Sequence, residues 1–334
     1  MGGKNKIVQA SKQASKQASK QASKQASKQA RELQLISAVV QDVFHQNVDV
    51  SSVFALKQGM TNDSFRCEVD GKTYVIRLNG IGTEQLLDRA GEAEAYRCIA
   101  PFGMGEHVVA ISPEKGYKVT EFLPDVRPCR PQVEADVRIC MKALHRLHAL
   151  RLPFTKTFDI MEQIVFYERL CHGVMRHADY EDVKRNVFRL APLQALRQDS
   201  FCLCHIDAVA DNFLLAEDGR VHLIDWEYAA GCDPLMDPAM FAIYAGYSRA
   251  QSEKLLDLYL SRRAQPGERL RFFSFMAAGG LLWSNWCDYK EQLGETFGSY
   301  AESQYRFAIA CPQWAMDASL EQAATGLCDE VSYD

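Results

Sequence analysis

Three polar residues in a strand-rich stretch have side chains that could act together on a phosphate group. Asp207 and Asn212 are five residues apart, and Asp225 follows a second apolar run beyond an Asp-Gly turn. An Asp-Gly pair between two apolar runs predicts a hairpin, which returns the chain to the edge from which it left. The three side chains should therefore converge there as a hard-oxygen set suited to Mg²⁺. A carboxylate beside a phosphate acceptor can also orient its hydroxyl or accept its proton.

Aromatic residues at helical spacing form a second group. Trp283 and Trp286 are three residues apart and Tyr289 lies three further on, so all three share one face of a predicted helix. Aromatic faces attract cations, and each face is worth about 0.5–2 kcal/mol when the cation is desolvated. An aromatic stripe of this spacing is also typical of core packing. The residues alone leave both interpretations open.

The first part of the chain has the pattern of a small sheet with one helix. Residues 65–78 alternate around an Asp-Gly pair, which predicts a hairpin. Residues 84–100 predict a helix that a proline stops, and residues 107–123 alternate again around a turn. We expect these elements to form an N-lobe over residues 33–123.

Helical periodicity dominates the remainder, which we expect to form a C-lobe over residues 124–334. One island of strands interrupts it, at residues 201–204, 212–215 and 221–224. The polar residues described first lie in this island, so the surrounding helices are its scaffold.

The motif H-x-D-x-x-x-x-N, followed by I-D-W-E at residues 224–227, resembles the protein-kinase-like superfamily. Within it, the chain resembles the choline/ethanolamine kinase and aminoglycoside phosphotransferase branch, and most of all bacterial choline kinases that feed phosphorylcholine onto surface glycans. The resemblance runs over about residues 55–310. It implies an α+β, protein-kinase-like two-lobed fold, with a small antiparallel-sheet N-lobe and a larger, mainly helical C-lobe.

The resemblance also implies roles for the polar residues. Asp207 corresponds to the catalytic aspartate that faces the substrate hydroxyl, and Asn212 and Asp225 correspond to the residues that hold Mg²⁺. Asp237 corresponds to a residue that braces the catalytic loop without touching substrate. The middle position of the motif, usually Asn in choline kinases, is Ile206 here.

A nucleotide site is implied in the N-lobe. A G-x-T-N stretch between two predicted strands resembles a short phosphate loop. Arg77 corresponds to a cation that neutralises the α- and β-phosphates, and Glu92 to its partner. From the residues alone, Arg77 could equally be an exposed strand residue and Glu92 part of a solvated helix face. The stretch from Glu121 to Leu123 corresponds to the interlobe hinge, whose backbone would bond adenine. The residues expected to bind ATP are Gly59, Thr61, Asn62, Arg77, Glu92, Glu121 and Leu123.

The acceptor pocket is implied by a match to the aromatic residues of choline kinases. Trp283 and Trp286 lie in an L-W-x-x-W helix, and Tyr228 and Tyr300 match two further pocket positions. Some choline kinases have an acidic residue where this chain has Tyr244. That difference favours an aromatic pocket over a charged one.

These expectations together predict an ATP- and Mg²⁺-dependent kinase that phosphorylates choline. Ethanolamine, thiamine or an aminoglycoside is the alternative acceptor, and a pseudokinase that only binds ligands is the alternative class. Five retained residues argue against a pseudokinase, namely Arg77, Glu92, Asp207, Asn212 and Asp225.

The charge distribution restricts the partners. The 334 residues carry a net charge of −5, yet the first 30 contain seven lysines and no acid. The rest of the chain is therefore acidic, which argues against a broad nucleic-acid-binding face and suits a cationic acceptor. No apolar run reaches the length needed for membrane insertion, and no secretory signal is evident. We expect a cytoplasmic protein, and nothing in the sequence specifies an oligomeric state.

Residues 11–30 repeat Ser-Lys-Gln-Ala five times without an apolar stripe, so we expect residues 1–32 to form a disordered tail. The codons AGC-AAG-CAA-GCA would encode this unit as a pure AGCA tract. Our hypothesis is a phase-variable DNA switch, which mixed synonymous codons would contradict.

The 11 cysteines show no C-x-x-C pair and are expected to be small buried residues in a reducing compartment.

Overall fold

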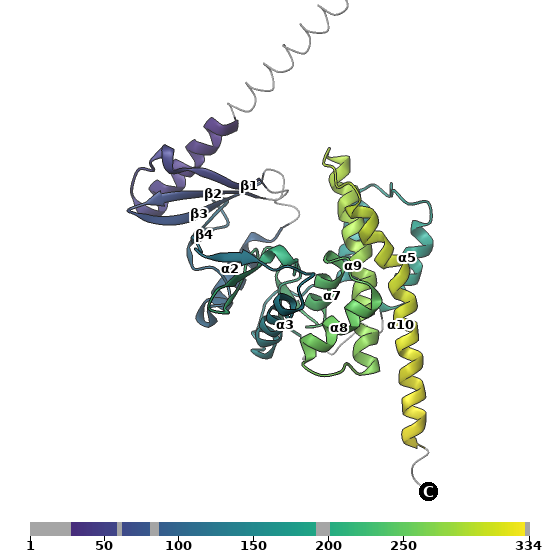
Figure 1. Ribbon diagram of the computed structural model, residues 1–334. Coiled ribbons are helices and arrows are strands. Elements are labelled where there is room, and N and C mark those ends of the chain that lie inside the picture. The colour runs from purple at the N-terminus through teal and green to yellow at the C-terminus, as the bar shows by residue number, and fades with distance from the viewer. Residues whose placement is uncertain (1–27, 59–61, 81–86, 192–200, 331–334) are drawn as a thin grey trace, which may run out of the picture. The chain divides into compact units, whose positions relative to one another are not determined.

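The computed structural model describes residues 28–58, 62–80, 87–191 and 201–330. The chain divides into two compact units, which are treated separately here (Figure 1). Unit 1 comprises Met1–Gln85 and His107–Phe122, and unit 2 comprises Leu86–Glu106 and Leu123–Asp334. Residues 86–106, which the sequence analysis assigned to the N-lobe, therefore cluster with unit 2.

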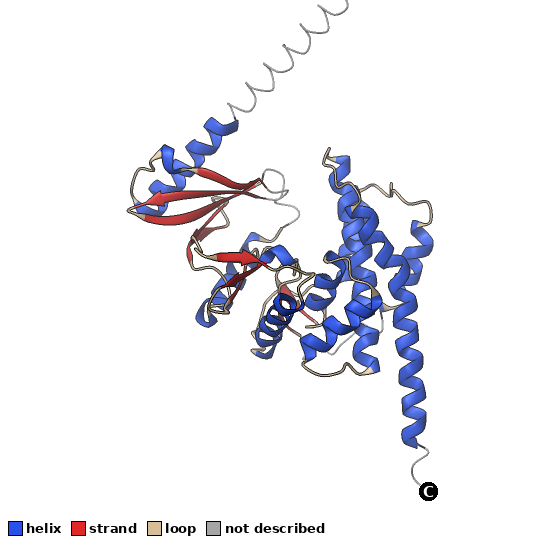
Figure 2. Cartoon of the chain, viewed as in Figure 1, coloured by secondary structure: helices blue, strands red, loops and turns tan. Residues whose placement is uncertain are grey.

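Unit 1 is built on a five-stranded antiparallel sheet with the order β1-β2-β3-β5-β4 (Figure 2). The predicted hairpin around Asp70-Gly71 is confirmed, since β2 and β3 pair through to Val69 and Lys72. Both turn residues have positive φ, at 52° and 72°, which Asp and Gly tolerate better than other residues. The strands are β1 (Phe54–Gln58), β2 (Asn62–Val69), β3 (Lys72–Asn79), β4 (Val108–Ser112) and β5 (Tyr117–Glu121).

Residues 28–44 form a helix that the sequence analysis missed. Its residues Ile36, Val39 and Val40 are buried and belong to one hydrophobic cluster with Phe65 and Ile76 of the sheet. The helix gives one face of the sheet an apolar cover. Residues 28–32 of the predicted disordered tail are therefore helical, and residues 1–27 lie outside the described residues.

Unit 2 consists mainly of helices around two short sheets. In the part of the unit that is described, the helices and 3₁₀ turns are α2 (Arg89–Ile99), η2 (Ala100–Phe102), α3 (Glu134–Ala149), α4 (Ile160–Leu170), α5 (Tyr180–Phe188), η4 (Ala210–Asn212), α7 (Met236–Tyr244), α8 (Arg249–Leu260), α9 (Pro266–Gln292) and α10 (Tyr300–Glu330). The predicted helix over 84–100 is confirmed from Arg89 onward, where the Asp88 carboxylate caps it by accepting from the Gly91 N–H.

Helix α9 is the centre of unit 2, where it packs against α4, α7 and α10 (Figure 1). Residues 270–288 of α9 are buried almost without interruption, so this helix has no polar face. Gly280 allows α10 to approach closely, because a Cβ there would lie 2.6 Å from the carbonyl oxygen of Gln304. Although α9 and α10 are long, none of the described helices is apolar enough over a sufficient length to cross a bilayer.

Two short sheets carry the loops of the candidate site. One has the order β6-β8-β9 and the other pairs β7 with β10, all antiparallel. The hairpin β8–β9 confirms the predicted strand island, with Phe213 opposite Leu223 and Leu215 opposite Val221. The strands are β6 (Val126–Pro128), β7 (Cys202–Cys204), β8 (Phe213–Ala216), β9 (Val221–Leu223) and β10 (Ala230–Cys232).

Candidate active site

The loop that carries Asp207 begins directly after β7 and contains a strained residue. Ile206 is fully buried with φ of 70°, a left-handed conformation that a β-branched residue adopts only under constraint. The constraint comes from α7, because the carboxylate of Asp237 accepts hydrogen bonds from the N–H of His205 at 2.9 Å and of Ile206 at 2.7 Å. The bracing role predicted for Asp237 thus has a direct geometric basis.

Asp237 is itself held by a buried histidine. His148 Nε2 lies 2.9 Å from Asp237 Oδ2, and His148 Nδ1 lies 2.8 Å from the hydroxyl of Tyr259. Burial opposes ionisation of Asp237, but hydrogen bonding and charge interaction with His148, with help from His205, keep its pKa below the ordinary value. An ionised carboxylate can only accept hydrogen bonds, so Nε2 of His148 donates to Asp237.

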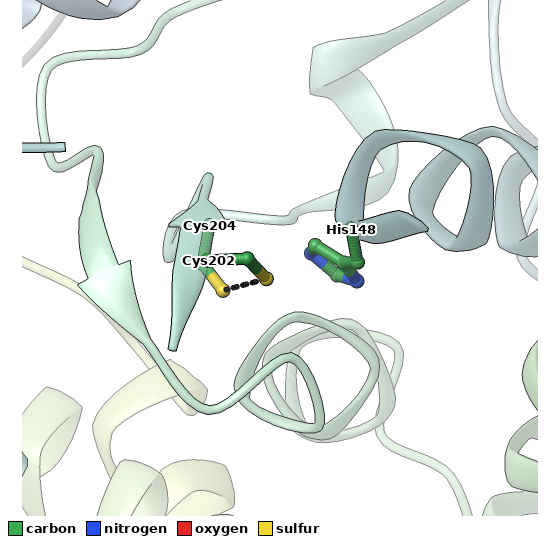
Figure 3. Close-up of side chains that lie close together, drawn as sticks. All are labelled: His148, Cys202 and Cys204. Atoms are coloured by element: carbon green, nitrogen blue, oxygen red, sulfur yellow. Dashed lines mark hydrogen bonds between the residues drawn. The ribbon is translucent and has the colours of Figure 1, made fainter. Parts of the chain in front are cut away.

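His148 also lies beside the thiols of Cys202 and Cys204, as Figure 3 shows. Their ligand atoms all lie within 4.8 Å of one another, and His with two Cys is a set that zinc favours. Both ring nitrogens of His148 are already hydrogen-bonded, however. The thiols also stay protonated, because a hydrogen bond with Cys204 and then burial raise the pKa of Cys202, and burial raises the pKa of Cys204. We interpret the cluster as buried support for β7. Nine of the ten described cysteines are buried, as predicted.

The structure brings Asp207 and Asn212 into direct contact. Asn212 Nδ2 donates to the Asp207 carbonyl at 2.9 Å and lies 3.3 Å from Asp207 Oδ2. On the other carboxylate oxygen, the hydroxyl of Tyr244 donates to Asp207 Oδ1 at 2.7 Å. No local pattern in the sequence indicates this contact, because Tyr244 lies 37 positions from Asp207.

Asp225 is brought to the same place by contacts between the two sides of the hairpin. The N–H of Ile224 donates to the carbonyl of Asn212 at 2.9 Å, and His205 Nε2 lies 2.8 Å from the carbonyl of Ile224. The His205 ring also packs edge-on against Trp226, with centroids 4.7 Å apart. Asp225 itself has φ of 65°, so both loops of the site contain a left-handed residue.

The electrostatics of this group fit a divalent cation. Burial raises the pKa of Asp207 above its ordinary value, and the negative charge of Asp225 raises it further. A cation between two such carboxylates would relieve both penalties. Asn212 uses its amide nitrogen toward Asp207, so its amide oxygen is the atom that can serve as a ligand. Asn212 and Asp225 thus offer oxygen atoms of the kind that Mg²⁺ prefers, and their role as its ligands stays a prediction.

A buried ion-pair group adjoins the I-D-W-E segment. Arg89 Nη1 lies 3.0 Å from Glu227 Oε2 and 3.3 Å from Glu92 Oε2, and all three side chains are at most 10% exposed. The alternative in which Glu92 belongs to a solvated helix face is therefore wrong. The roles of Arg89 and Glu227 escaped the sequence analysis, since the two residues are 138 positions apart.

The nucleotide residues predicted in unit 1 lie on its sheet. Arg77 on β3 is only 6% exposed, so the alternative of an exposed strand residue is also wrong. Asn62 begins β2 and is 7% exposed. Gly59 and Thr61 lie outside the described residues.

The predicted hinge coincides with the point where the chain leaves unit 1, after Phe122. The N–H of Glu121 donates to His107 and that of Phe122 donates to Thr73, both within unit 1. Leu123 is the first residue of the stretch in unit 2. Adenine bonding by this backbone stays a prediction.

The predicted aromatic residues form one group in unit 2. The ring of Trp283 packs edge-on against Tyr228 at 5.5 Å and against Trp286 at 6.1 Å. Tyr244 is tilted against Trp283 at 5.6 Å, which joins this group to Asp207. For Tyr300, burial raises the pKa of the hydroxyl, and smaller contributions come from Cys287 and from the charge of Asp207.

Trp283 and Trp286 are each 5% exposed, so core packing and pocket lining are both compatible with their burial. Tyr289, which shares their helix, packs against Tyr167 of α4 at 6.2 Å. Of the three residues in the stripe, Trp283 and Trp286 therefore belong to the group around Asp207, whereas Tyr289 packs against Tyr167.

An antiparallel-sheet unit and a helical unit with this loop arrangement define a protein-kinase-like phosphotransferase. The sequence matches the phosphotransferase enzyme family over residues 53–273, and the chain belongs to that family. Within the protein-kinase-like superfamily it falls in the choline/ethanolamine kinase and aminoglycoside phosphotransferase branch. The predicted family, fold class and enzyme class are confirmed.

Individual relatives are similar over most of their length. Protein LicA of Haemophilus influenzae is 27% identical over 282 residues, which cover 78% of this chain and 80% of LicA. The crystal structure of choline kinase LicA from Streptococcus pneumoniae is 26% identical with a TM-score of 0.71, covering 84% of this chain and 98% of that one. A structure of LicA in complex with AMP is 27% identical with a TM-score of 0.72, covering 85% and 99%.

Proposed function

We propose that this phosphotransferase is an ATP- and Mg²⁺-dependent choline kinase that forms phosphocholine. The observation that carries the proposal is the junction of Asp207 with the aromatic group, since Tyr244 contacts both the carboxylate and Trp283. Similarity to choline kinase LicA supports choline as the acceptor, and the LicA complex with AMP supports an adenine nucleotide as the donor.

Asp207 orients the acceptor and receives its proton. In the proposed reaction, the choline oxygen attacks the γ-phosphorus in line, the bond from that phosphorus to the β,γ-bridging oxygen breaks, and ADP leaves. The hydroxyl proton passes to Asp207 and then to solvent. Burial and then the charge of Asp225 raise the pKa of Asp207, so its carboxylate is a stronger base than that of an exposed aspartate. Held by Asn212 and Asp225, Mg²⁺ would neutralise charge on the phosphates.

The aromatic group recognises the quaternary ammonium. Tyr228, Trp283, Trp286 and Tyr300 would surround its methyl groups, and a desolvated cation gains about 0.5–2 kcal/mol from each ring face. The acidic composition of the chain beyond the first 30 residues adds long-range attraction for a cation.

For the nucleotide, we propose that Arg77 neutralises the α- and β-phosphates and that Glu92 supports this cation. Burial of both side chains supports structured roles for them. Gly59, Thr61 and Asn62 would approach the phosphates, and the backbone of Glu121 to Leu123 would bond adenine.

The cellular setting is a further part of the proposal. The product would serve phosphorylcholine decoration of bacterial surface glycans, with the enzyme in the cytoplasm and the Ser-Lys-Gln-Ala repeat encoded by a phase-variable tract. The nucleotide sequence of the gene tests the last point, since a pure AGCA tract is expected.

A coupled ADP-release assay with choline, ethanolamine, thiamine and an aminoglycoside tests the function. Choline should give the highest kcat/KM, and EDTA should abolish turnover. A higher kcat/KM for another compound would make that compound the acceptor in place of choline. No ADP release with any of the four would favour a ligand-binding pseudokinase. Asp207→Ala should abolish phosphotransfer while ATP still binds. Retained kcat in that variant would reject Asp207.

A further inference from the structure

Helix α7 holds three consecutive residues of the catalytic loop from its two ends. Near its N-terminus, the Asp237 carboxylate accepts from the backbone N–H groups of His205 and Ile206. At its last residue, the Tyr244 hydroxyl donates to the side chain of Asp207. Seven residues separate Asp237 from Tyr244, close to two helical turns, so both side chains lie on one face of the helix. The helix acts as a template for the backbone of the loop and for its carboxylate.

The two oxygens of Asp207 have different donors. Oδ1 accepts from Tyr244 at 2.7 Å, and Oδ2 lies at the longer distance of 3.3 Å from Asn212. A carboxylate oxygen has two lone pairs, so each oxygen can accept a second hydrogen bond. The donors therefore fix the rotation of the carboxylate and still leave it able to receive a substrate hydroxyl.

The ring of Tyr244 is fixed as firmly as its hydroxyl. It packs against Trp283 at 5.6 Å, and Trp283 Nε1 in turn lies 3.3 Å from the sulfur of Met240, one turn before Tyr244 on the same helix. The Tyr244 side chain, which belongs to α7, is thus held against α9. These contacts restrict the rotation of the Tyr244 side chain, which lowers the entropy cost of orienting the Asp207 carboxylate.

We propose that Tyr244 is a positioning residue for Asp207 and, through its ring, a wall of the acceptor site. The proposal rests on the proposed function, because it assigns Asp207 to the acceptor hydroxyl. The two parts of the side chain then have separable effects. The hydroxyl governs the chemical step, and the ring governs how well the acceptor binds.

Two substitutions separate these parts. Tyr244→Phe keeps the ring and removes the hydroxyl, so kcat should fall by about 10- to 100-fold while KM for the acceptor changes by less than about threefold. Tyr244→Leu removes the ring as well, so KM for a quaternary ammonium acceptor should also rise by about 3- to 30-fold. KM for ATP should stay near its wild-type value in both.

Tyr247→Phe is the matched control. Tyr247 is also largely buried, and its hydroxyl bonds the backbone carbonyl of Pro131, away from Asp207. This variant should keep wild-type kcat and KM, and thermal unfolding should verify that all three variants fold. An unchanged kcat in Tyr244→Phe, or an equal fall in Tyr247→Phe, would overturn the proposal.

A crystal structure of Tyr244→Phe gives a result that does not depend on the acceptor. The Asp207 carboxylate should be rotated or divided between two conformers. A carboxylate that keeps its wild-type rotamer as a single conformer would overturn the positioning role. If the wild-type enzyme prefers an acceptor other than choline, the kinetic test is read with that acceptor, so failure of the choline assignment is distinguishable from failure of the Tyr244 assignment.

Discussion

Replacement of Asp237 tests whether one buried carboxylate maintains the catalytic loop. Asp237 is fully buried and accepts from the N–H groups of His205 and Ile206 and from His148. Alanine leaves two backbone N–H groups buried without an acceptor, each costing about 1–3 kcal/mol. It also releases the left-handed backbone at Ile206. Because such penalties are not additive, we expect Asp237→Ala to lower the free energy of unfolding by about 3–5 kcal/mol.

Asp237→Asn should have an intermediate effect. Its amide oxygen still accepts one hydrogen bond, but the amide nitrogen is a donor placed against another donor. Both variants should lose kcat, since Asp207 is the next residue after the released turn. Asp317→Ala is the control, because it removes an aspartate whose partner is the surface residue Arg249.

Urea unfolding followed by tryptophan fluorescence measures the effect. All four tryptophans lie within unit 2, so the signal reports the unit that contains Asp237. If Asp237→Ala unfolds within about 1 kcal/mol of the wild type and keeps its kcat, the bracing argument is wrong. An equal loss in Asp317→Ala would also contradict it.

Two further predictions concern the acceptor group and acid stability. Trp283→Ala or Trp286→Ala should raise KM for choline more than KM for ATP in the ADP-release assay. Equal effects on both KM values would indicate that these residues serve core packing and do not bind the acceptor. Hydrogen bonds from Arg127 and Arg130 hold the pKa of buried Asp136 well below its usual range. That stabilisation is full above the unfolded-state pKa of about 3.9 and is lost as the pH falls below it. Urea midpoints of Asp136→Asn should therefore depend less on pH between 5 and 3, and identical slopes would refute the assignment.

The sequence predicted the hairpins and the loop set well, because Asp-Gly turns and the spacing of Asp207, Asn212 and Asp225 are local signals. It missed the helix over residues 28–44, although Ile36, Val39 and Val40 have helical spacing. The Ser-Lys-Gln-Ala repeat runs on to Ala30 and has no apolar stripe, so the pattern of the repeat does not indicate that its last residues are helical.

Long-range polar contacts could not be predicted from the sequence, for a different reason. The contact between Arg89 and Glu227 joins residues 138 positions apart, and the bond from Tyr244 to Asp207 joins residues 37 apart. Both depend on how helices pack, which local periodicity does not specify. Tyr244 was also compared with an acidic family position, which directed attention to its charge and away from its hydroxyl.

The backbone and the side chain of Ile206 contribute differently to the left-handed turn of the catalytic loop. The turn uses only the N–H of Ile206, while its side chain is enclosed in the core. A side chain that fits the space and tolerates the backbone can therefore occupy this position, whereas the buried N–H of Ile206 needs an acceptor, which Asp237 supplies. The backbone conformation at Ile206 therefore depends on Asp237, which lies outside the motif and 31 residues away.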